Sequence, residues 1–179
     1  MAIVDALGPG GEYRTRKREL ITAVSGTPVA EMTVVPPLYV ARTVNAQRKT
    51  RPLPVAEREA ALTRAADMFL SEKIAGLDFD RYIGMTSQVS GLPIAVTRAG
   101  AHSVAEQVAA VCGSVWPAQP VGAERDWRCI RNGGAVWSRK GDVFAVHASG
   151  NAPGVHGLWP QALALGYRVA VRPSRREPF

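Results

Sequence analysis

The segment 141–179 contains the pattern that most restricts what this chain can fold into. An apolar run, DVFAVHA, is followed by the turn GNAPG, by VHGLWPQALAL with helical spacing, and by a second apolar run, RVAVRPS. Continuous apolar runs of this length are typical of buried parallel strands, and parallel strands need a crossover between them. Pro160 is expected either to bend the helix or to lie in its first turns, and Gly166 to cap it. The segment therefore predicts a βαβ unit.

Upstream of this unit, the sequence predicts one strand and four helices. The strand covers 29–35 and is broken by two prolines, after which a short helix follows at about 38–48. In PVAEREAALTRAADMFLSEKI, apolar residues recur every three or four positions, which predicts the clearest helix of the chain. Two more helices are expected, one from Asp78 to about Ser90 with Gly91 as its cap, and an alanine-rich one in IAVTRAGAHSVAEQVAAVCGSV.

Between the helices and the βαβ unit, the pattern changes to alternating apolar and polar residues. The sequence WRCIRNGGAVWSRK alternates around Asn132-Gly133-Gly134, which is a hairpin turn signal. The expected fold class is α/β. Its parts are an N-terminal extension (1–37), a helical segment (38–120), a β-hairpin (121–140) and the βαβ unit (141–179).

The chain has a net charge of +7, but this charge does not by itself identify a binding partner. Basic chains attract nucleic acid, anionic membranes and phosphorylated ligands. The arginines cluster at RTRKR, RTVNAQRKTR and RPSRR, but no aromatic-rich platform or zinc-finger spacing accompanies them in the sequence. Solvated surface charge is therefore favoured over a nucleic-acid partner, which stays open as an alternative resting on charge alone.

The sequence also gives expectations about location and cysteine chemistry. No apolar run is long enough to span a bilayer, and the N-terminus lacks the order of a secretory signal, so neither a membrane partner nor export is expected. Cys112 and Cys129 stand in no metal-ligand spacing, and the cytoplasm is the expected compartment. Cys112 is interpreted as a small core residue and Cys129 as a residue of a hairpin strand.

In a βαβ unit, the residues that follow the two strands meet at the edge where open α/β sheets bind ligands. These residues are Ser149, Gly150, Asn151, Ala152, Pro153 and Gly154 after the first strand, and Arg172, Pro173, Ser174, Arg175 and Arg176 after the second. A cationic cluster beside a glycine turn suits a phosphorylated nucleotide, and an asparagine amide held in such a turn suits a developing oxyanion. The alternative, that GNAPG is turn chemistry only, stays open.

Four motifs in the same order resemble the aldehyde dehydrogenase superfamily over roughly residues 38–179. ALALGYRVAVRPSR is similar to the family's AL-x-x-G-N-x-x-V-x-K-P-S-E, and SGNAPG shares the Asn and Pro of P-W-N-[FY]-P. LPVAEREAALTRAADMFL and IGMTSQVSGLPIAVTRAGAHSVAEQVAAV resemble the two helical motifs upstream. The GNAPG form looks more like the acyl-thioester (fatty acyl) reductase branch.

The resemblance implies roles for individual residues. Asn151 stands where the family has its oxyanion-stabilising Asn, and Ser149 and Gly150 precede it, with Gly150 in place of a Trp. On the second strand, Arg172 replaces a ribose-binding Lys, and Pro173 and Ser174 keep their types. Arg175 replaces a Glu that repels the 2′-phosphate of NADP. The implied cofactor is therefore NADP or NAD, with NADP favoured.

The resemblance also implies the whole activity. The chain would be the N-terminal part of an NAD(P)-dependent aldehyde or acyl-thioester oxidoreductase, containing the first βαβ unit of a Rossmann-like nucleotide-binding domain. The nucleophilic cysteine and the general base would come later, so this chain alone is expected to be inactive. The implied partners are a small aldehyde or acyl thioester and, in the full-length protein, further copies of itself. The alternative is a non-catalytic nucleotide-binding or interaction module.

The remaining candidate residues have structural interpretations. His147 is expected to be a satisfied strand residue, and His156 either caps backbone groups or contacts phosphate. Three isolated histidines do not predict a metal site. The tryptophans at 116, 127, 137 and 159 are expected to serve core and hairpin packing.

Overall fold

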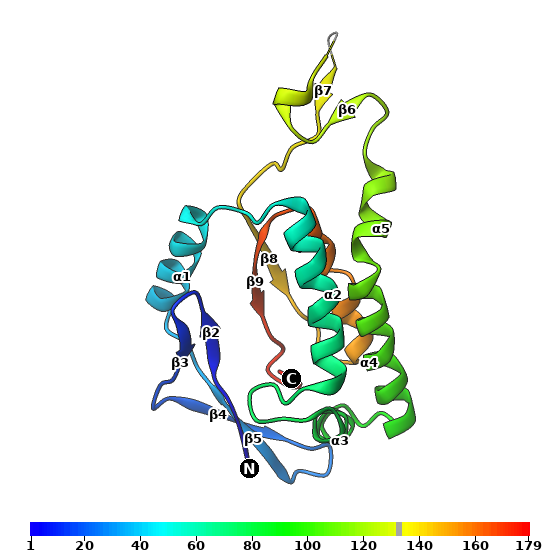
Figure 1. Ribbon diagram of the computed structural model, residues 1–179. Coiled ribbons are helices and arrows are strands. Elements are labelled where there is room, and N and C mark those ends of the chain that lie inside the picture. The colour runs from blue at the N-terminus through cyan, green and yellow to red at the C-terminus, as the bar shows by residue number, and fades with distance from the viewer. Residues whose placement is uncertain (132–133) are drawn as a thin grey trace.

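The computed structural model describes residues 1–131 and 134–179 and has a mixed α/β architecture (Figure 1). The helices are α1 (Pro37–Lys49), α2 (Val55–Ser71), α3 (Phe79–Ser90), α4 (Ile94–Ala109), α5 (Val111–Val115) and α6 (Pro160–Ala164). Short 3₁₀ helices are η1 (Trp116–Ala118), η2 (Trp127–Cys129) and η3 (Pro153–Gly157). The strands are β1 (Ala2–Val4), β2 (Ala6–Gly8), β3 (Gly11–Tyr13), β4 (Arg18–Thr22), β5 (Pro28–Thr33), β6 (Ala123–Glu124), β7 (Ala135–Val136), β8 (Val143–His147) and β9 (Arg168–Arg172).

The predicted pair of parallel strands near the C-terminus is confirmed. β8 pairs with β9 in parallel, in a register that runs from Val143 opposite Arg168 to His147 opposite Arg172. The crossover is less regular than predicted, because it consists of η3 and then the short α6 instead of one long helix. Pro160 lies in the first turn of α6, where its missing N–H costs no helical hydrogen bond. Gly166 follows the helix with a φ of 89°, as expected for a residue that ends it.

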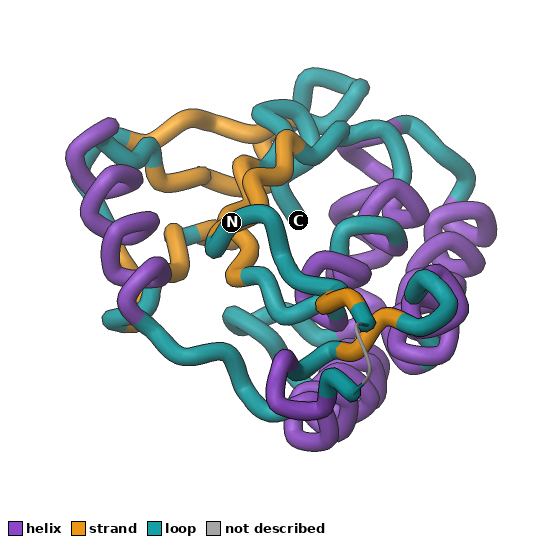
Figure 2. Tube along the Cα trace, turned by 90° about the horizontal axis from the view of Figure 1, so that it is seen from above, coloured by secondary structure: helices purple, strands orange, loops and turns teal. Residues whose placement is uncertain are grey.

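The prediction that β8 and β9 are buried is wrong. Most residues of β8 are exposed, and Phe144 and Val171 keep 44% and 41% of their surface accessible. Among the described residues the two strands pair only with each other, so their outer edges stay open. Figures 1 and 2 show α1 on one side of the pair and the larger group of helices on the other. From α1, the Gln47 side-chain amide donates to the carbonyl of Val169 over 3.1 Å.

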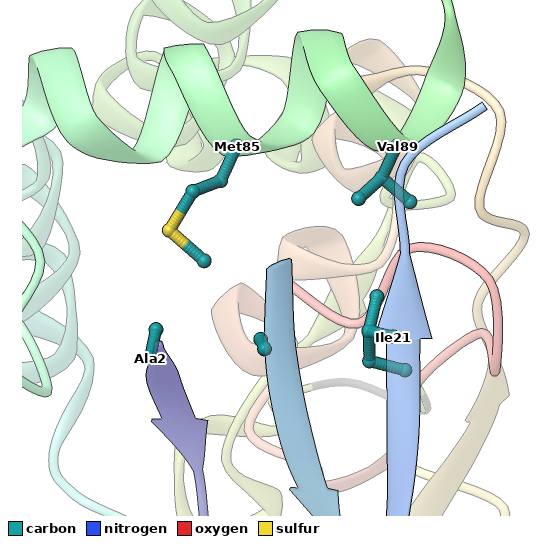
Figure 3. Packing of buried hydrophobic residues seen from close by; sticks show 5 residues of the cluster. Ala2, Ile21, Met85 and Val89 are labelled. Atoms are coloured by element: carbon teal, nitrogen blue, oxygen red, sulfur yellow. The ribbon is translucent and has the colours of Figure 1, made fainter. Parts of the chain in front are cut away.

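The N-terminal residues form more structure than the single strand expected there. β1, β5 and β4 make a three-stranded sheet, with β1 parallel and β4 antiparallel to β5, and β2 and β3 form a separate hairpin. Helix α3 covers the sheet: Met85 and Val89 point from it towards Ala2 and Ile21 (Figure 3). Ile21 is only 2% exposed. The residues that the sequence assigned to an extension therefore form a hydrophobic cluster together with α3.

The predicted helices are confirmed with small differences at their ends. Asp78 caps α3 by accepting a hydrogen bond of 2.8 Å from the Arg81 N–H, and Gly91 ends it in the left-handed conformation. The alanine-rich helix is interrupted at Ala110, whose backbone lies at φ −90° and ψ 0°, so it forms α4 and α5. Leu62 of α2 packs with α5 residues and with Ala164 in the second hydrophobic cluster.

The segment 121–140 does not form the predicted hairpin. β6 and β7 pair in parallel, and residues 127–129 form η2 instead of a strand. The predicted turn falls on Asn132 and Gly133, which lie outside the described residues. Asp126 explains part of the difference, because its carboxylate accepts from the Arg128 N–H over 3.0 Å and pairs with the Arg128 guanidinium at 2.6 Å, which favours a turn. In Figure 1, β6 and β7 project beyond the rest of the chain.

The sequence predicted that the tryptophans serve core and hairpin packing, and in this region that prediction holds for only some of them. Trp116 and Trp137 meet edge to face at 6.4 Å, and Arg125 lies over the Trp116 ring at 3.9 Å. Trp127, however, is 71% exposed. It belongs to η2 at the surface of the projecting segment, so core packing does not explain it.

Candidate functional site

The residues that follow β8 and β9 lie side by side, as the βαβ prediction requires. The Ala148 N–H donates to the Arg172 carbonyl over 3.0 Å, which extends the pairing one residue past β8. Beyond that point Gly150 packs directly against Ser174: a Cβ built on Gly150 would collide with the Ser174 side chain. Glycine is therefore required here by the close approach of the two loops.

These loops form one wall of a cavity of about 460 Å³. Of the predicted site residues, Gly150, Asn151 and Arg175 line it, together with Arg176. The opposite wall comes from residues 20–24, in and after β4, and from the end of α3. Ser149, Arg172, Pro173 and Ser174 do not line this cavity, although they belong to the same two loops.

The side-chain oxygen of Asn151 accepts a hydrogen bond within the site. The Ser149 hydroxyl donates to the Asn151 Oδ1 over 2.7 Å. In this assignment of the amide, the Oδ1 atom is the acceptor, so the Nδ2 group keeps both of its N–H donors for another partner. Asn151 itself is exposed beside the cavity. The arrangement can present an amide donor to an anionic or carbonyl oxygen.

The arginines of the second loop are exposed, and they differ in whether an acid lies near them. The Arg175 side chain is 71% exposed, and its Nε lies 3.8 Å from the Glu19 carboxylate on β4. Arg172 is exposed at the end of β9. Ser174 is used locally, because its Oγ accepts from the Arg176 N–H over 3.1 Å and closes the turn. The loop therefore offers guanidinium groups at the strand ends, one of them already near an acid.

Sequence reasoning missed the contribution of β4 to the site. Glu19 pairs with Arg175, and residues 20–24 line the cavity, yet the N-terminal segment gave no sign of a functional role. The run RELITAV contains β-branched residues that favour a strand. Nothing in its spacing indicates that this strand faces a turn 130 residues further along, because such proximity is set by the tertiary fold.

The cysteines and histidines lie elsewhere. Cys112 is 3% exposed and burial raises its thiol pKa, in agreement with its interpretation as a core residue. Cys129 is exposed in η2, which corrects its assignment to a strand. His147 is exposed at the end of β8 and not a core residue. Within residues 1–131 and 134–179, no three His, Cys, Asp or Glu side chains gather in a way that would hold a metal ion.

Comparison with known proteins shows which solved structures share the fold of this chain. No family model and no curated protein matches the chain. Several solved structures, however, match almost the whole chain. The NADP-dependent glyceraldehyde-3-phosphate dehydrogenase of Bacillus halodurans C-125 matches with a TM-score of 0.76 and 16% identity, over 98% of this chain and 38% of that one. The NAD-dependent aldehyde dehydrogenase of Sinorhizobium meliloti matches with a TM-score of 0.73 and 17% identity, over 98% of this chain and 36% of that one.

A third structure gives the same picture. The methylmalonate-semialdehyde dehydrogenase of Oceanimonas doudoroffii matches with a TM-score of 0.73 and 16% identity, over 99% of this chain and 36% of that one. The chain thus spans little more than a third of the length of these three structures. In the described part of the chain no helix is both long and apolar enough to cross a bilayer. The chain has a partial aldehyde dehydrogenase fold.

Proposed function

We propose that this chain contributes the cofactor-binding βαβ unit and an oxyanion donor to an NAD(P)-dependent aldehyde dehydrogenase or acyl-thioester reductase. The observation that carries the proposal is the cavity at the ends of β8 and β9, which Asn151 and Arg175 line together. Carboxyl ends of parallel strands are where open α/β sheets bind their ligands. The solved structures of this fold include proteins described as NADP-dependent and as NAD-dependent.

The residues present fit a dinucleotide. Exposed guanidinium groups at Arg172, Arg175 and Arg176 suit phosphate oxygens, which they bind through paired hydrogen bonds. When bound, the nicotinamide accepts or donates a hydride. Asn151 would donate its Nδ2–H to the oxygen that becomes negative when a carbonyl carbon is attacked. The Ser149 hydroxyl would keep the amide turned for that purpose.

Cofactor preference tests the proposal through Arg175. A guanidinium pairs with the 2′-phosphate of NADP, whereas a carboxylate repels it, so Arg175→Glu is expected to lower the NADP-to-NAD affinity ratio about 5- to 30-fold. Glu19→Gln is expected to shift the ratio the other way, because it releases Arg175 from an acid 3.8 Å away. Dissociation constants for both dinucleotides, measured by calorimetry on this chain, give the result.

Two controls separate the site from general charge effects. Arg64→Glu makes the same charge change on the exposed side of α2 and should leave the ratio unmoved. Asn151→Ala should leave both affinities within a few-fold, since its assigned role is towards the reacting oxygen. A wild-type chain that prefers NAD, or that binds neither dinucleotide, would count against the proposal.

The cysteines give a second test. Neither lines the cavity beside Asn151, and the Cys112 thiol is buried with a raised pKa, so neither is placed as a nucleophile. The purified chain is therefore expected to oxidise no aldehyde above background when NADP reduction is followed by absorbance. Turnover that disappears in Cys112→Ser or Cys129→Ser would overturn this assignment, whereas loss in neither variant would point to another nucleophile.

A further inference from the structure

A second cavity, of about 420 Å³, lies between the helices and the C-terminal residues. Its walls come from α2, α4, α6, β9 and the segment 177–179, which Figure 1 shows beside α2. Most of the lining is apolar, with Leu62, Phe69, Val108 and Leu163 from the helices and Val171 from β9. Cavities of this size and character are typical of small-molecule sites. It shares no lining residue with the cavity beside Asn151.

Glu177 lines this apolar cavity and lacks a partner. Its residue surface is 2% exposed, and neither carboxylate oxygen has a hydrogen-bond partner or ion pair in the described part of the chain. Burial raises the pKa of Glu177 to about 7. The Phe179 N–H acts in the opposite direction and lowers this pKa, although its geometry is not that of a hydrogen bond. Buried acids in folded proteins are normally paired, so this carboxyl group calls for a counterpart.

The other ionisable groups of the cavity do not supply one. Burial and the charge of Glu177 raise the pKa of the Tyr82 phenol, which therefore stays neutral. Burial lowers the pKa of His156, so its imidazole is neutral as well. The His156 Nδ1 accepts from the Trp159 Nε1–H over 3.3 Å, which puts the ring proton on Nε2. That Nε2 is buried and has no acceptor.

We propose that this cavity binds a small, largely apolar molecule whose primary ammonium group pairs with Glu177. A cation satisfies both carboxylate oxygens and removes the cost of an isolated buried charge. A hydrocarbon would leave Glu177 unpaired, and a carboxylate ligand would be repelled by it. Walls that are almost wholly apolar offer too few partners for a chain of waters to replace the ligand. The proposal does not rest on the dehydrogenase function.

A charge series of equal length tests this binding site. Calorimetric titration of the chain with n-hexylamine, n-hexanol and hexanoate at about pH 8, where Glu177 is ionised, should show the amine binding at least ~10-fold more tightly than the alcohol, and no binding of hexanoate. Glu177→Gln should remove the advantage of the amine. Glu57→Gln, the same change at an exposed position of α2, should keep it.

A third variant separates the cavity from the carboxyl group. Ala65 lines the cavity from α2, and Ala65→Phe should fill it and weaken both the amine and the alcohol, with the circular dichroism of the chain unchanged. Equal affinity of the wild type for amine and alcohol overturns the proposal. So does an amine that binds Glu177→Gln as well as the wild type, or a wild type that binds none of the three probes.

Discussion

Glu177→Gln is expected to raise the free energy of unfolding by about 3 kcal/mol above pH 7, and to leave it unchanged near pH 4. A carboxyl group whose pKa rises from 4.5 to about 7 on folding costs the folded state roughly that much once it is ionised in both states. Below its unfolded pKa the group is protonated in both states and the cost vanishes. The wild type therefore loses stability as the pH rises from about 4.5 to 7, and the Gln variant does not.

Urea unfolding of both proteins across this pH range measures the difference. Glu57→Gln removes an acid from an exposed position and serves as the control, with an expected effect within about 0.5 kcal/mol at every pH. A difference between wild type and Glu177→Gln that is the same at pH 4 and pH 8 would show that the charge of Glu177 is not the cause.

The second large effect is expected at the contact between the two loops of the site. Gly150→Ala should lower the free energy of unfolding by about 1–3 kcal/mol, the usual range for overpacking. The added Cβ would collide with the Ser174 side chain and come within 3.1 Å of the Glu177 Cβ, so the turn after β9 would have to move. Because that turn carries Arg175, NADP affinity should fall in the same variant.

Gly154→Ala is the matched control in the same turn region. A Cβ on Gly154 meets nothing within 4 Å, so this substitution should change stability by no more than about 0.5 kcal/mol. Denaturant unfolding of the two variants side by side gives the comparison. Equal stability of the two variants would mean that the loops after β8 and β9 do not approach each other as described.

The sequence predicted well those elements that carry their own local signals. The spacing of apolar residues indicated α2, and Asp78 and Gly91 marked both ends of α3. The two apolar runs around GNAPG predicted the parallel pair β8 and β9. Each of these signals comes from residues that are close together in the chain, and local propensities therefore determine the outcome.

The sequence did not predict what depends on contacts between distant residues. β1 has three residues, too few for an alternating pattern, and it exists because β5 pairs with it and α3 covers it. Segment 121–140 differs for a local reason instead: alternation suggested a hairpin, but capping by Asp126 two residues before Arg128 favoured a turn. The burial of Glu177 gave no signal at all, because an acid in a basic, proline-containing tail is ordinarily exposed.

For the candidate site, the sequence identified the two loops but not the other wall. Asn151 and Arg175 were predicted together from the geometry of a βαβ unit, and they do line one cavity. The pairing of Arg175 with Glu19 joins residues at opposite ends of the chain. Only the tertiary arrangement of β4 against the loop after β9 creates that ion pair, so no spacing in the sequence could indicate it.

The hydrogen bonds that fasten β9 and α6 to the early helices have a consequence for the order of folding. Gln47 bonds to Val169, Thr50 to Arg168, and Arg58 to the Ala164 carbonyl, across 122, 118 and 106 positions of the chain. Closing a loop of that length costs on the order of 4 kcal/mol of chain entropy before any such bond contributes. Helices α1 and α2 need only local bonds, so they can form first and offer a preformed surface to β9 and α6. During synthesis, the first 150 residues would emerge from the ribosome with that surface still uncovered.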